Sequence, residues 1–357
     1  MQTQCHLSVL IHEQAKKYGS RPALTFRSFG SLQWKTASWN QFSLRVKQVS
    51  NALLNLGLKP QDRIAVFSQN CIQYLYTDFG AYGVRVISIP FYATSSEQQI
   101  QYMVQDGGVK VIFVGEQEQY NKAHRIFALC PTLERIVIFD QSVRISTHDP
   151  NALYFSDFIK LGEQLPRQPE VEKLWSQASM DDICNILYTS GTTGDSKGVM
   201  LTYGQYDAAF KANGKCVPVT DKDRIIDFLP FTHIFERGWA YLGLTVGAQL
   251  IINTYPKEIQ QSMRQTHPTS MSAVPRFWEK VYIAVKNKID EANPVEKKLF
   301  HYALNVGRKY NVEYLSRGRR PPLPLRMEYA AINKSVLSLV RKQLGLEHSN
   351  IFPPAGA

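Results

Sequence analysis

The sequence contains few cysteines, and none of them has the spacing of a metal site. Five cysteines are scattered along the 357 residues without a Cys-x-x-Cys pair. An odd, dispersed set is typical of free thiols in a reducing compartment and argues against a disulfide framework or a structural zinc site. We therefore expect a cytoplasmic protein. The five are Cys5, Cys71, Cys130, Cys184 and Cys216.

Long apolar runs are also absent. The opening sequence, MQTQCHLSVLIHEQAKK, lacks the basic segment and long apolar core of a secretory signal and is typical of an amphipathic helix. The longest apolar stretch, Ala240 to Ile252, is interrupted by Thr245 and Gln249 and is too short to span a bilayer. Hydrophobic residues still make up 44% of the chain, which permits a large core shared by two or more sub-domains.

Acidic residues are in deficit. There are 30 Asp and Glu against 41 Lys and Arg, which gives a formal net charge of +11. Such an excess suits nucleic acid, an anionic membrane or anionic small ligands. Because no helix-turn-helix, zinc or RNA-binding signature is present, nucleic acid is the weakest of these partners. A solvated helix face and a ligand or membrane surface remain equally good interpretations of the basic residues late in the chain, which are Arg308, Lys309, Arg317, Arg319, Arg320, Arg326, Lys334, Arg341 and Lys342.

Helical and strand patterns alternate through the first half of the chain. Ser96, followed by Gln99, has the signature of a helix capping box. Strand, helix and strand at this spacing predict an α/β fold with a mostly parallel sheet and helices on both faces. The predicted helices are His6 to Lys17, Trp39 to Leu56, Cys71 to Tyr82 and Ser96 to Val104. The predicted strands are Arg63 to Phe67, Val86 to Ile89, Val109 to Val114 and Arg135 to Phe139.

The pattern weakens between Asp140 and Ser179. This stretch is polar and contains three prolines, which indicates a connection between sub-domains. Apolar strands resume at Ile183, at Ile225 and over Gln249 to Asn253.

The segment ILYTSGTTGDSKGVML, Ile186 to Leu201, concentrates glycines and hydroxyl side chains around one lysine. Glycines let backbone N–H groups approach a ligand closely, hydroxyls donate hydrogen bonds, and successive amides form an anion nest, so the segment suits a polyphosphate. It is neither a Walker A motif nor a Gly-x-Gly-x-x-Gly motif. The alternative is an ordinary surface turn. The candidate ligands are Thr189, Ser190, Gly191, Thr192, Thr193, Gly194 and Lys197.

This segment resembles the phosphate-binding signature of the adenylate-forming superfamily, which includes acyl-CoA synthetases, peptide-synthetase adenylation domains and luciferases. Ser196 departs from the family's usual proline. The resemblance implies the N-terminal domain of that superfamily, built from two packed, mostly parallel-sheet α/β sub-domains with the active site between them. We place the first at residues 1–175 and the second at residues 176–357.

A second candidate stretch, DFLPFTHIFERGW, contains His233 and Glu236 three residues apart, which can share one helix face. By itself this spacing fits a structural histidine better than a functional one. The form His-x-Phe-Glu-Arg, however, resembles the long-chain acyl-CoA synthetase branch, which places a histidine beside the acyl and nucleotide pockets. His233 and Glu236 are therefore our catalytic candidates. No second histidine lies at ligand spacing, so we predict no protein-ligated metal.

Three further features resemble the same family. The Val-Pro-Arg segment at residues 274–276 predicts a helix starting near Pro275, with Arg276 either contacting phosphate or supporting the scaffold. The loop FYATS, residues 91–95, follows Pro90 and resembles the family's Pro-x-Tyr-x-Thr loop, for which we expect a structural role. Trp239, Tyr241 and Leu242 are either walls of an acyl tunnel or plain core.

The resemblance implies that a fatty acid and ATP form an acyl-adenylate and diphosphate, that coenzyme A then displaces AMP, and that Mg²⁺ assists. The last residues, Gly356 and Ala357, resemble the start of the adenine-pocket segment, so later family motifs and the C-terminal domain are absent from this sequence. We expect an N-terminal part with little ligase activity by itself, unless a separate chain supplies the rest. The alternatives are a non-catalytic nucleotide- or acyl-binding regulator, or a scaffold in peripheral contact with the anionic inner face of a membrane.

Overall fold

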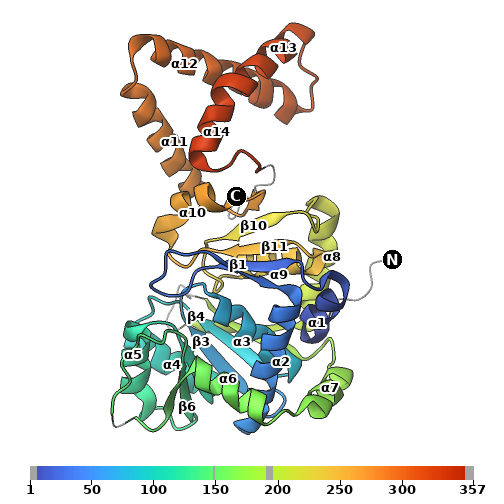
Figure 1. Cartoon of the computed structure of the whole chain (residues 1–357), viewed down its shortest axis with the longest axis vertical. Coiled ribbons are helices and arrows are strands. Elements are labelled where there is room, and N and C mark those ends of the chain that lie inside the picture. The colour runs from blue at the N-terminus through green and yellow to red at the C-terminus, as the bar shows by residue number, and fades with distance from the viewer. Residues whose placement is uncertain (1–5, 148, 190–195, 350–357) are drawn as a thin grey trace. The chain divides into compact units, whose positions relative to one another are not determined.

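The computed structural model describes residues 6–147, 149–189 and 196–349. Two compact units divide the chain: unit 1 is Met1–Pro256 and unit 2 is Lys257–Ala357. Figure 1 shows strands and helices interleaved in unit 1 and helices predominating in unit 2. The predicted α/β class with mostly parallel sheets is confirmed.

Unit 1 contains a seven-stranded sheet in the order β7-β6-β5-β3-β4-β8-β9. All neighbouring pairs are parallel except β8 with β9. Its strands are β3 (Arg63–Phe67), β4 (Ile87–Phe91), β5 (Val111–Val114), β6 (Arg135–Ile138), β7 (Ala152–Tyr154), β8 (Ile183–Thr189) and β9 (Lys197–Thr202).

A second sheet of unit 1 has the order β10-β11-β1-β2. Strands β10, β11 and β1 are parallel, and β2 runs antiparallel to β1. The strands are β1 (Pro22–Phe26), β2 (Lys35–Ser38), β10 (Arg224–Asp227) and β11 (Gln249–Ile252). The boundary that we predicted at residues 175/176 does not coincide with this arrangement, because β1 pairs with β11 and β4 pairs with β8 across it.

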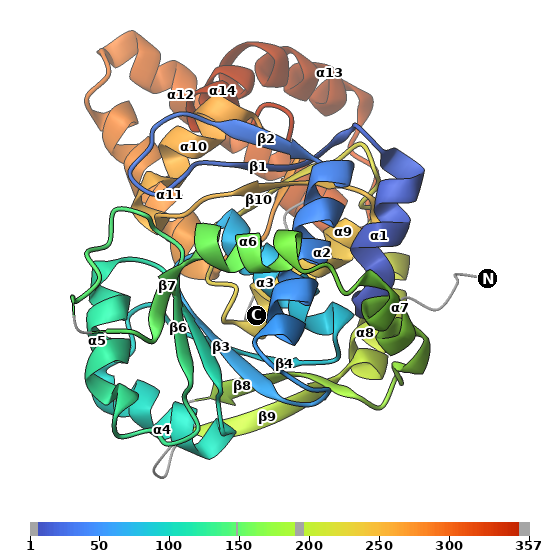
Figure 2. The ribbon, with the colours of Figure 1, turned by 60° about the horizontal axis from the view of Figure 1, so that its bottom comes forward.

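Helices cover both faces of the seven-stranded sheet. Side chains of α4 and α5 pack with Ala65 and Phe67 in one core, whereas α3 and α6 contact the sheet from the other face beside α2 (Figure 2). The helices of unit 1 are α1 (Leu7–Tyr18), α2 (Trp39–Asn55), α3 (Ile72–Gly83), α4 (Glu97–Gly107), α5 (Gln117–Phe127), α6 (Phe155–Gln164), α7 (Gln168–Gln177), α8 (Tyr203–Cys216) and α9 (Ile234–Val246).

Local sequence explains where several helices begin. Ser96 and Gln99 form the predicted capping box of α4, with Gln99 N donating to Ser96 Oγ (3.2 Å) and Ser96 N donating to Gln99 Oε1 (2.8 Å). Equivalent boxes start α2 at Ser38 and α8 at Thr202. Each box satisfies amide groups that the first helical turn leaves without partners.

The segment from Asp140 to Ser179 is more regular than predicted. It contains β7, which pairs with β6, and helices α6 and α7. The buried side chains of Phe155, Phe158 and Ile159 form the packed face of α6. Gly162 lies so close to α2 that an added Cβ would be 1.9 Å from Gln48 O, and only glycine permits that approach.

Unit 2 is built mainly from helices. Its elements are α10 (Ile259–Thr266), β12 (Ser270–Met271), α11 (Pro275–Asp290), α12 (Pro294–Arg308), the π-helical turn η2 (Lys309–Tyr314), the 3₁₀ turn η3 (Leu315–Arg317), α13 (Leu323–Ile332), the π-helical turn η4 (Asn333–Leu337) and α14 (Ser338–Leu344); the 3₁₀ turn η1 (Pro256–Glu258) precedes them. Helix α11 starts at Pro275, as predicted. No helix among the described residues is long and apolar enough to cross a membrane.

Candidate functional site

The predicted phosphate-binding segment is flanked by two paired strands. Thr189 ends β8 and Lys197 begins β9, and the two residues are partners in the antiparallel register. Both side chains are exposed. Ser190, Gly191, Thr192, Thr193 and Gly194 lie outside the described residues. The strands therefore bring a hydroxyl and a cation together, which is an arrangement that fits an anionic polyphosphate.

Side-chain hydrogen bonds fix β8 along its length. Asn185 Nδ2 donates to Ser88 O of β4 (2.8 Å), and Tyr82 Oη donates to Asn185 Oδ1 (2.8 Å). Nearer the end of the strand, Tyr188 Oη donates to the Asp106 carboxylate (2.5 Å). Burial, reinforced by Asp106, raises the pKa of Tyr188, so this side chain remains a neutral donor. Thr189 consequently projects from a firmly held strand.

The carboxyl ends of β3, β4 and β8 lie at one edge of the seven-stranded sheet, because these strands are parallel. The chain passes from β3 into α3 on one face and from β4 into α4 on the other. Connections that leave neighbouring parallel strands in opposite directions open a crevice between the strand ends, which is where doubly wound folds bind ligands. The edge at Phe67 and Phe91 is thus the expected ligand-binding edge.

The stretch carrying His233 is held against this edge. Asn70, which follows β3, donates from Nδ2 to Leu229 O (2.7 Å) and accepts from Phe231 N at Oδ1 (2.9 Å). Thr232 Oγ1 lies 3.4 Å from Phe91 O, at the end of β4. Two motifs that are far apart in the sequence, the hydroxyl–lysine segment and the histidine segment, therefore lie at the same edge of the sheet.

Glu236 and Arg237 hold the same stretch from the first turn of α9. Glu236 Oε1 accepts hydrogen bonds from Phe228 N (2.9 Å) and Leu229 N (3.3 Å), and Arg237 Nε donates to Phe231 O (2.9 Å). Both side chains are fully buried. We call residues 228–233, together with Asn70, Glu236 and Arg237, the clamped turn. A catalytic role for Glu236 stays a prediction, and its contacts are those of an anchor.

His233 is the N-cap of α9, and its side chain is exposed. Its Nδ1 accepts a hydrogen bond from Phe235 N (3.2 Å). Since an N–H can only donate, the neutral ring carries its own proton on Nε2. His233 therefore offers a fixed N–H donor to a ligand.

Behind the clamped turn lies a buried ion pair that local sequence patterns did not reveal. Arg237 Nη1 of α9 is 2.7 Å from Asp78 Oδ2 of α3, and both side chains are at most 1% exposed. Tyr241 Oη and Ser88 Oγ donate to the Asp78 carboxylate at 2.6 and 2.5 Å. Burial alone would lower the pKa of Arg237, but Asp78 and the surrounding tyrosines raise it. The one signal in the sequence was Asp78, which is the single charged residue of the mainly apolar helix α3.

A second buried carboxyl, Asp227, lies at the end of β10. Its side chain is fully buried, and neither carboxyl oxygen has a hydrogen-bond partner. Burial and the nearby Glu236 raise its pKa well above the usual value. Folding therefore favours the protonated, neutral form of Asp227, beside Glu236, whose carboxylate accepts hydrogen bonds from two backbone amides.

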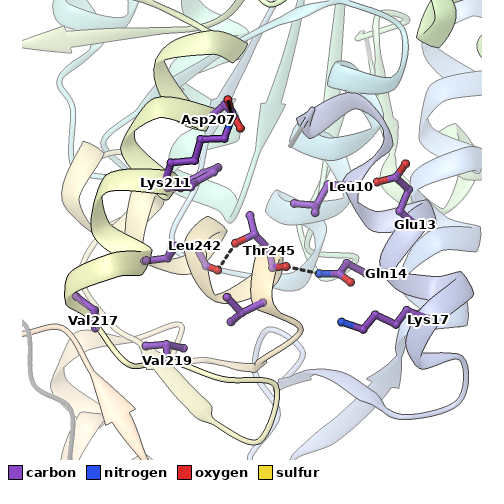
Figure 3. Close-up of a pocket in the computed structure, with 13 residues that line it drawn as sticks. Leu10, Glu13, Gln14, Lys17, Asp207, Lys211, Val217, Val219, Leu242 and Thr245 are labelled. Atoms are coloured by element: carbon purple, nitrogen blue, oxygen red, sulfur yellow. Dashed lines mark hydrogen bonds and ion pairs between the residues drawn. The ribbon is translucent and has the colours of Figure 1, made fainter. Parts of the chain in front are cut away.

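A cavity of about 580 Å³ lies between α1, α8 and α9 (Figure 3). Its walls are held by Gln14 Nε2, which donates to Thr245 O (2.6 Å), and by Lys211, which pairs with Asp207 (2.6 Å). Leu242, a predicted acyl-tunnel wall, lines this cavity, whereas Tyr241 belongs to the buried ion-pair cluster. Because Thr245 is 12 residues beyond His233 on α9, it lies roughly 18 Å along the helix from the clamped turn.

The remaining candidates are less constrained. Arg276 is exposed in the first turn of α11, and both roles suggested for it stay predictions. Trp239 is buried in α9. Among the described residues, no group of three or more His, Cys, Asp and Glu side chains is placed to hold a metal ion. The described cysteines are unpaired, and burial raises the pKa of Cys71 to about 12.

A mostly parallel α/β fold with a hydroxyl–lysine hairpin and a clamped histidine turn at one sheet edge is the arrangement of a ligand-binding α/β domain. The chain belongs to the AMP-binding enzyme family, whose model matches residues 11–335. It is similar to the long-chain-fatty-acid–CoA ligase ACSBG2 of Xenopus laevis, with 26% identity over 348 residues, covering 95% of this chain and 46% of that protein. The chain thus spans about half the length of the curated relatives that it matches.

Solved structures agree on the fold. The anthranilate CoA ligase AuaEII in complex with anthranoyl-AMP matches with a TM-score of 0.67 and 20% identity, covering 77% of this chain and 51% of that one. The long-chain-fatty-acid–CoA ligase FadD1 from Archaeoglobus fulgidus matches with a TM-score of 0.64 and 20% identity, covering 81% and 55%. Together they show the predicted α/β fold, and the match to the family model together with the curated relatives bears out the predicted resemblance to adenylate-forming ligases.

Proposed function

We propose that this chain carries the ATP- and fatty-acid-binding part of a long-chain fatty acid–CoA ligase. In that reaction the carboxylate oxygen of the fatty acid attacks the α-phosphorus of ATP and diphosphate leaves. The thiolate of coenzyme A then attacks the acyl carbon, and AMP leaves. The observation that carries this proposal is the position of the Thr189–Lys197 hairpin and the clamped turn at the same sheet edge.

The residues have distinct roles in this proposal. Thr189, Ser190, Gly191, Thr192, Thr193 and Gly194 offer hydroxyl and amide donors to the β- and γ-phosphates. Lys197 adds a positive charge, and Mg²⁺, when bound together with ATP, would reduce the repulsion between the phosphates and the carboxylate. His233 donates its Nε2 proton in a hydrogen bond to substrate oxygen. Glu236 acts through His233 by fixing the turn that carries it.

Preorganisation is the physical argument for this assignment. Two anions must meet for the first step, so catalysis depends on position and on donors that are already aimed at the developing charge. Asn70, Glu236 and Arg237 supply that rigidity through their hydrogen bonds to the turn. We propose a cytoplasmic location as well, which fractionation of the tagged full chain would test.

Calorimetric titration of Mg·ATP into the chain tests the nucleotide site. A hydrogen bond to a charged group contributes about 1.5–3 kcal/mol, so Lys197→Met should weaken binding roughly 10- to 150-fold. Lys215→Met, an exposed lysine at the end of α8, is the matched control and should leave binding unchanged. Absence of ATP binding by the unsubstituted chain would contradict the proposal.

Diphosphate release separates the proposed ligase from the alternative of a non-catalytic binding protein. The ligase function predicts palmitate-dependent diphosphate release from ATP by the chain, or by the chain combined with a separate C-terminal part. ATP binding without release in either case would favour a nucleotide-binding regulator.

A further inference from the structure

The positive charge of the chain is concentrated in unit 2. Residues 257–357 contain 17 Lys and Arg against 8 Asp and Glu, which gives a formal charge of +9 out of the total of +11. Unit 1, with more than twice as many residues, carries the remaining +2. The basic excess is therefore not a property of the unit that contains the candidate nucleotide site.

Unit 2 also exposes bulky apolar side chains at helical spacing. On α12, Val295, Leu299 and Tyr302 lie at positions i, i+4 and i+7 and are 78%, 47% and 49% exposed. On α13, Leu323 and Met327 lie at i and i+4 and are 65% and 67% exposed. Residues at these spacings share one helix face. These five residues are the α12–α13 surface.

The two helices of this surface lie against each other. Tyr302 Oη of α12 donates a hydrogen bond to the carboxylate of Glu328, which is next to Met327 on α13. The buried residues of the two helices are Ala303 and Val306 of α12 and Leu325 of α13. The exposed apolar residues are therefore additional to the side chains that these helices bury.

Basic residues accompany the apolar ones. Lys298 adjoins Leu299, Arg326 adjoins Met327, and Arg319 and Arg320 precede α13, all of them exposed. Lys297 forms an ion pair with Asp290 at 3.2 Å, and no other Lys or Arg among the described residues of unit 2 forms one. The charges that border the α12–α13 surface are consequently not neutralised by acidic neighbours in this part of the chain.

We propose that the α12–α13 surface docks onto an anionic phospholipid bilayer. Aliphatic and tyrosine side chains enter the headgroup region while neighbouring Lys and Arg side chains meet lipid phosphates, which is how basic amphipathic helices lie in a membrane interface. A bilayer offers an apolar interior to the exposed apolar residues and phosphate groups to the neighbouring basic residues. The proposal is independent of nucleotide binding and goes beyond the proposed ligase function.

Vesicle cosedimentation tests this docking with the full chain. We expect binding to vesicles of phosphatidylcholine with 30% phosphatidylglycerol at low salt, weaker binding at high salt, and little binding to pure phosphatidylcholine. Since each Lys or Arg near an anionic surface contributes about a factor of five, the triple variant Arg319→Gln/Arg320→Gln/Arg326→Gln should bind roughly 100-fold more weakly. The double variant Leu323→Ser/Met327→Ser should also weaken binding and should reduce the fraction that resists high salt.

Matched controls keep the net charge and polarity changes the same but place them in unit 1. Lys16→Gln/Lys173→Gln/Lys215→Gln removes three exposed charges, and Leu32→Ser/Leu165→Ser removes two exposed leucines. Both should bind vesicles nearly as tightly as the unsubstituted chain. Circular dichroism and Mg·ATP calorimetry on the same preparations establish that each variant is folded and separate a failed docking from a failed nucleotide site.

Several outcomes would overturn the docking proposal. One is that the unsubstituted chain does not bind the anionic vesicles at low salt. Another is that the unit 1 charge control loses as much vesicle binding as the triple arginine variant. Unchanged binding of the Leu323→Ser/Met327→Ser variant would remove the α12–α13 surface from the contact. A dimer in gel filtration that these two serines abolish, or binding to polyglutamate as tight as to vesicles, would assign the surface to a second copy or an acidic protein instead.

Discussion

Unit 1 and unit 2 use their charged residues in opposite ways. In unit 1, Arg237 and Asp78 are buried, paired and surrounded by hydroxyl donors, and they tie α9 to α3 behind the clamped turn. In unit 2, Lys and Arg side chains lie in water beside exposed apolar residues. A net charge of +11 could suggest that a basic protein surface attracts ATP. The distribution shows instead that the proposed nucleotide site, with Lys197 and its neighbouring donors, belongs to a nearly neutral unit.

Breaking the buried pair should have the largest effect on stability. Arg237→Leu leaves the Asp78 charge buried without its partner, which typically costs about 3–5 kcal/mol. Urea denaturation would measure the loss. The double variant Asp78→Leu/Arg237→Leu removes both charges and should recover part of that stability. If the double variant were as unstable as Arg237→Leu, the unpaired Asp78 charge would not be the source of the loss.

Replacing Asp227 by asparagine should increase stability at neutral pH. Its pKa is higher in the folded state than the ordinary value near 4, so unfolding releases a proton and stability falls as pH rises above about 4. The slope from this group is about 1.4 kcal/mol per pH unit until the folded pKa is reached. Asp227→Asn removes that slope. Parallel stability curves for the two proteins between pH 5 and 7, measured with urea, would contradict the assignment.

Removing Asn70 tests the clamped turn directly. Asn70→Ala leaves Leu229 O and Phe231 N without their partners, which costs about 1–3 kcal/mol and loosens the turn that carries His233. Asn121→Ala, at an exposed side-chain pair on α5, is the control and should change stability by less than about 0.5 kcal/mol. Equal effects of the two substitutions would argue against a special role for Asn70.

The smallest effect should come from an ion pair of unit 2. Lys297 and Asp290 are 40% and 48% exposed, so Lys297→Ala should change the free energy of unfolding by about 0–1 kcal/mol. Salt should weaken even this contribution. A loss comparable to that of Arg237→Leu would remove the contrast between the two units.

Local sequence patterns were sufficient for much of the fold. Strand β3 has the predicted bounds Arg63–Phe67, the Ser96 box caps α4, and α11 starts at Pro275. The sequence pattern did not predict α6, because the apolar face of this helix is short and packs on α2, which is distant in the sequence. The close approach of Gly162 to Gln48 is likewise a tertiary contact.

The candidate site was predictable where its residues are contiguous. Thr189 and Lys197 belong to one motif, and their pairing follows from the hairpin. Asn70 and Asp78 were missed because their partners Phe231 and Arg237 lie about 160 positions later in the chain, and no local periodicity connects them. Tertiary hydrogen bonds of this kind appear only once the parallel strands place the two segments at one edge.

Calorimetric titration of Mg·ATP into two charge variants tests the separation between the units most directly. The account predicts that Arg319→Gln/Arg320→Gln/Arg326→Gln binds ATP like the unsubstituted chain and that Lys197→Met binds roughly 10- to 150-fold more weakly. Loss of ATP binding in the triple arginine variant, with binding retained in Lys197→Met, would place the nucleotide on the basic unit and contradict the account.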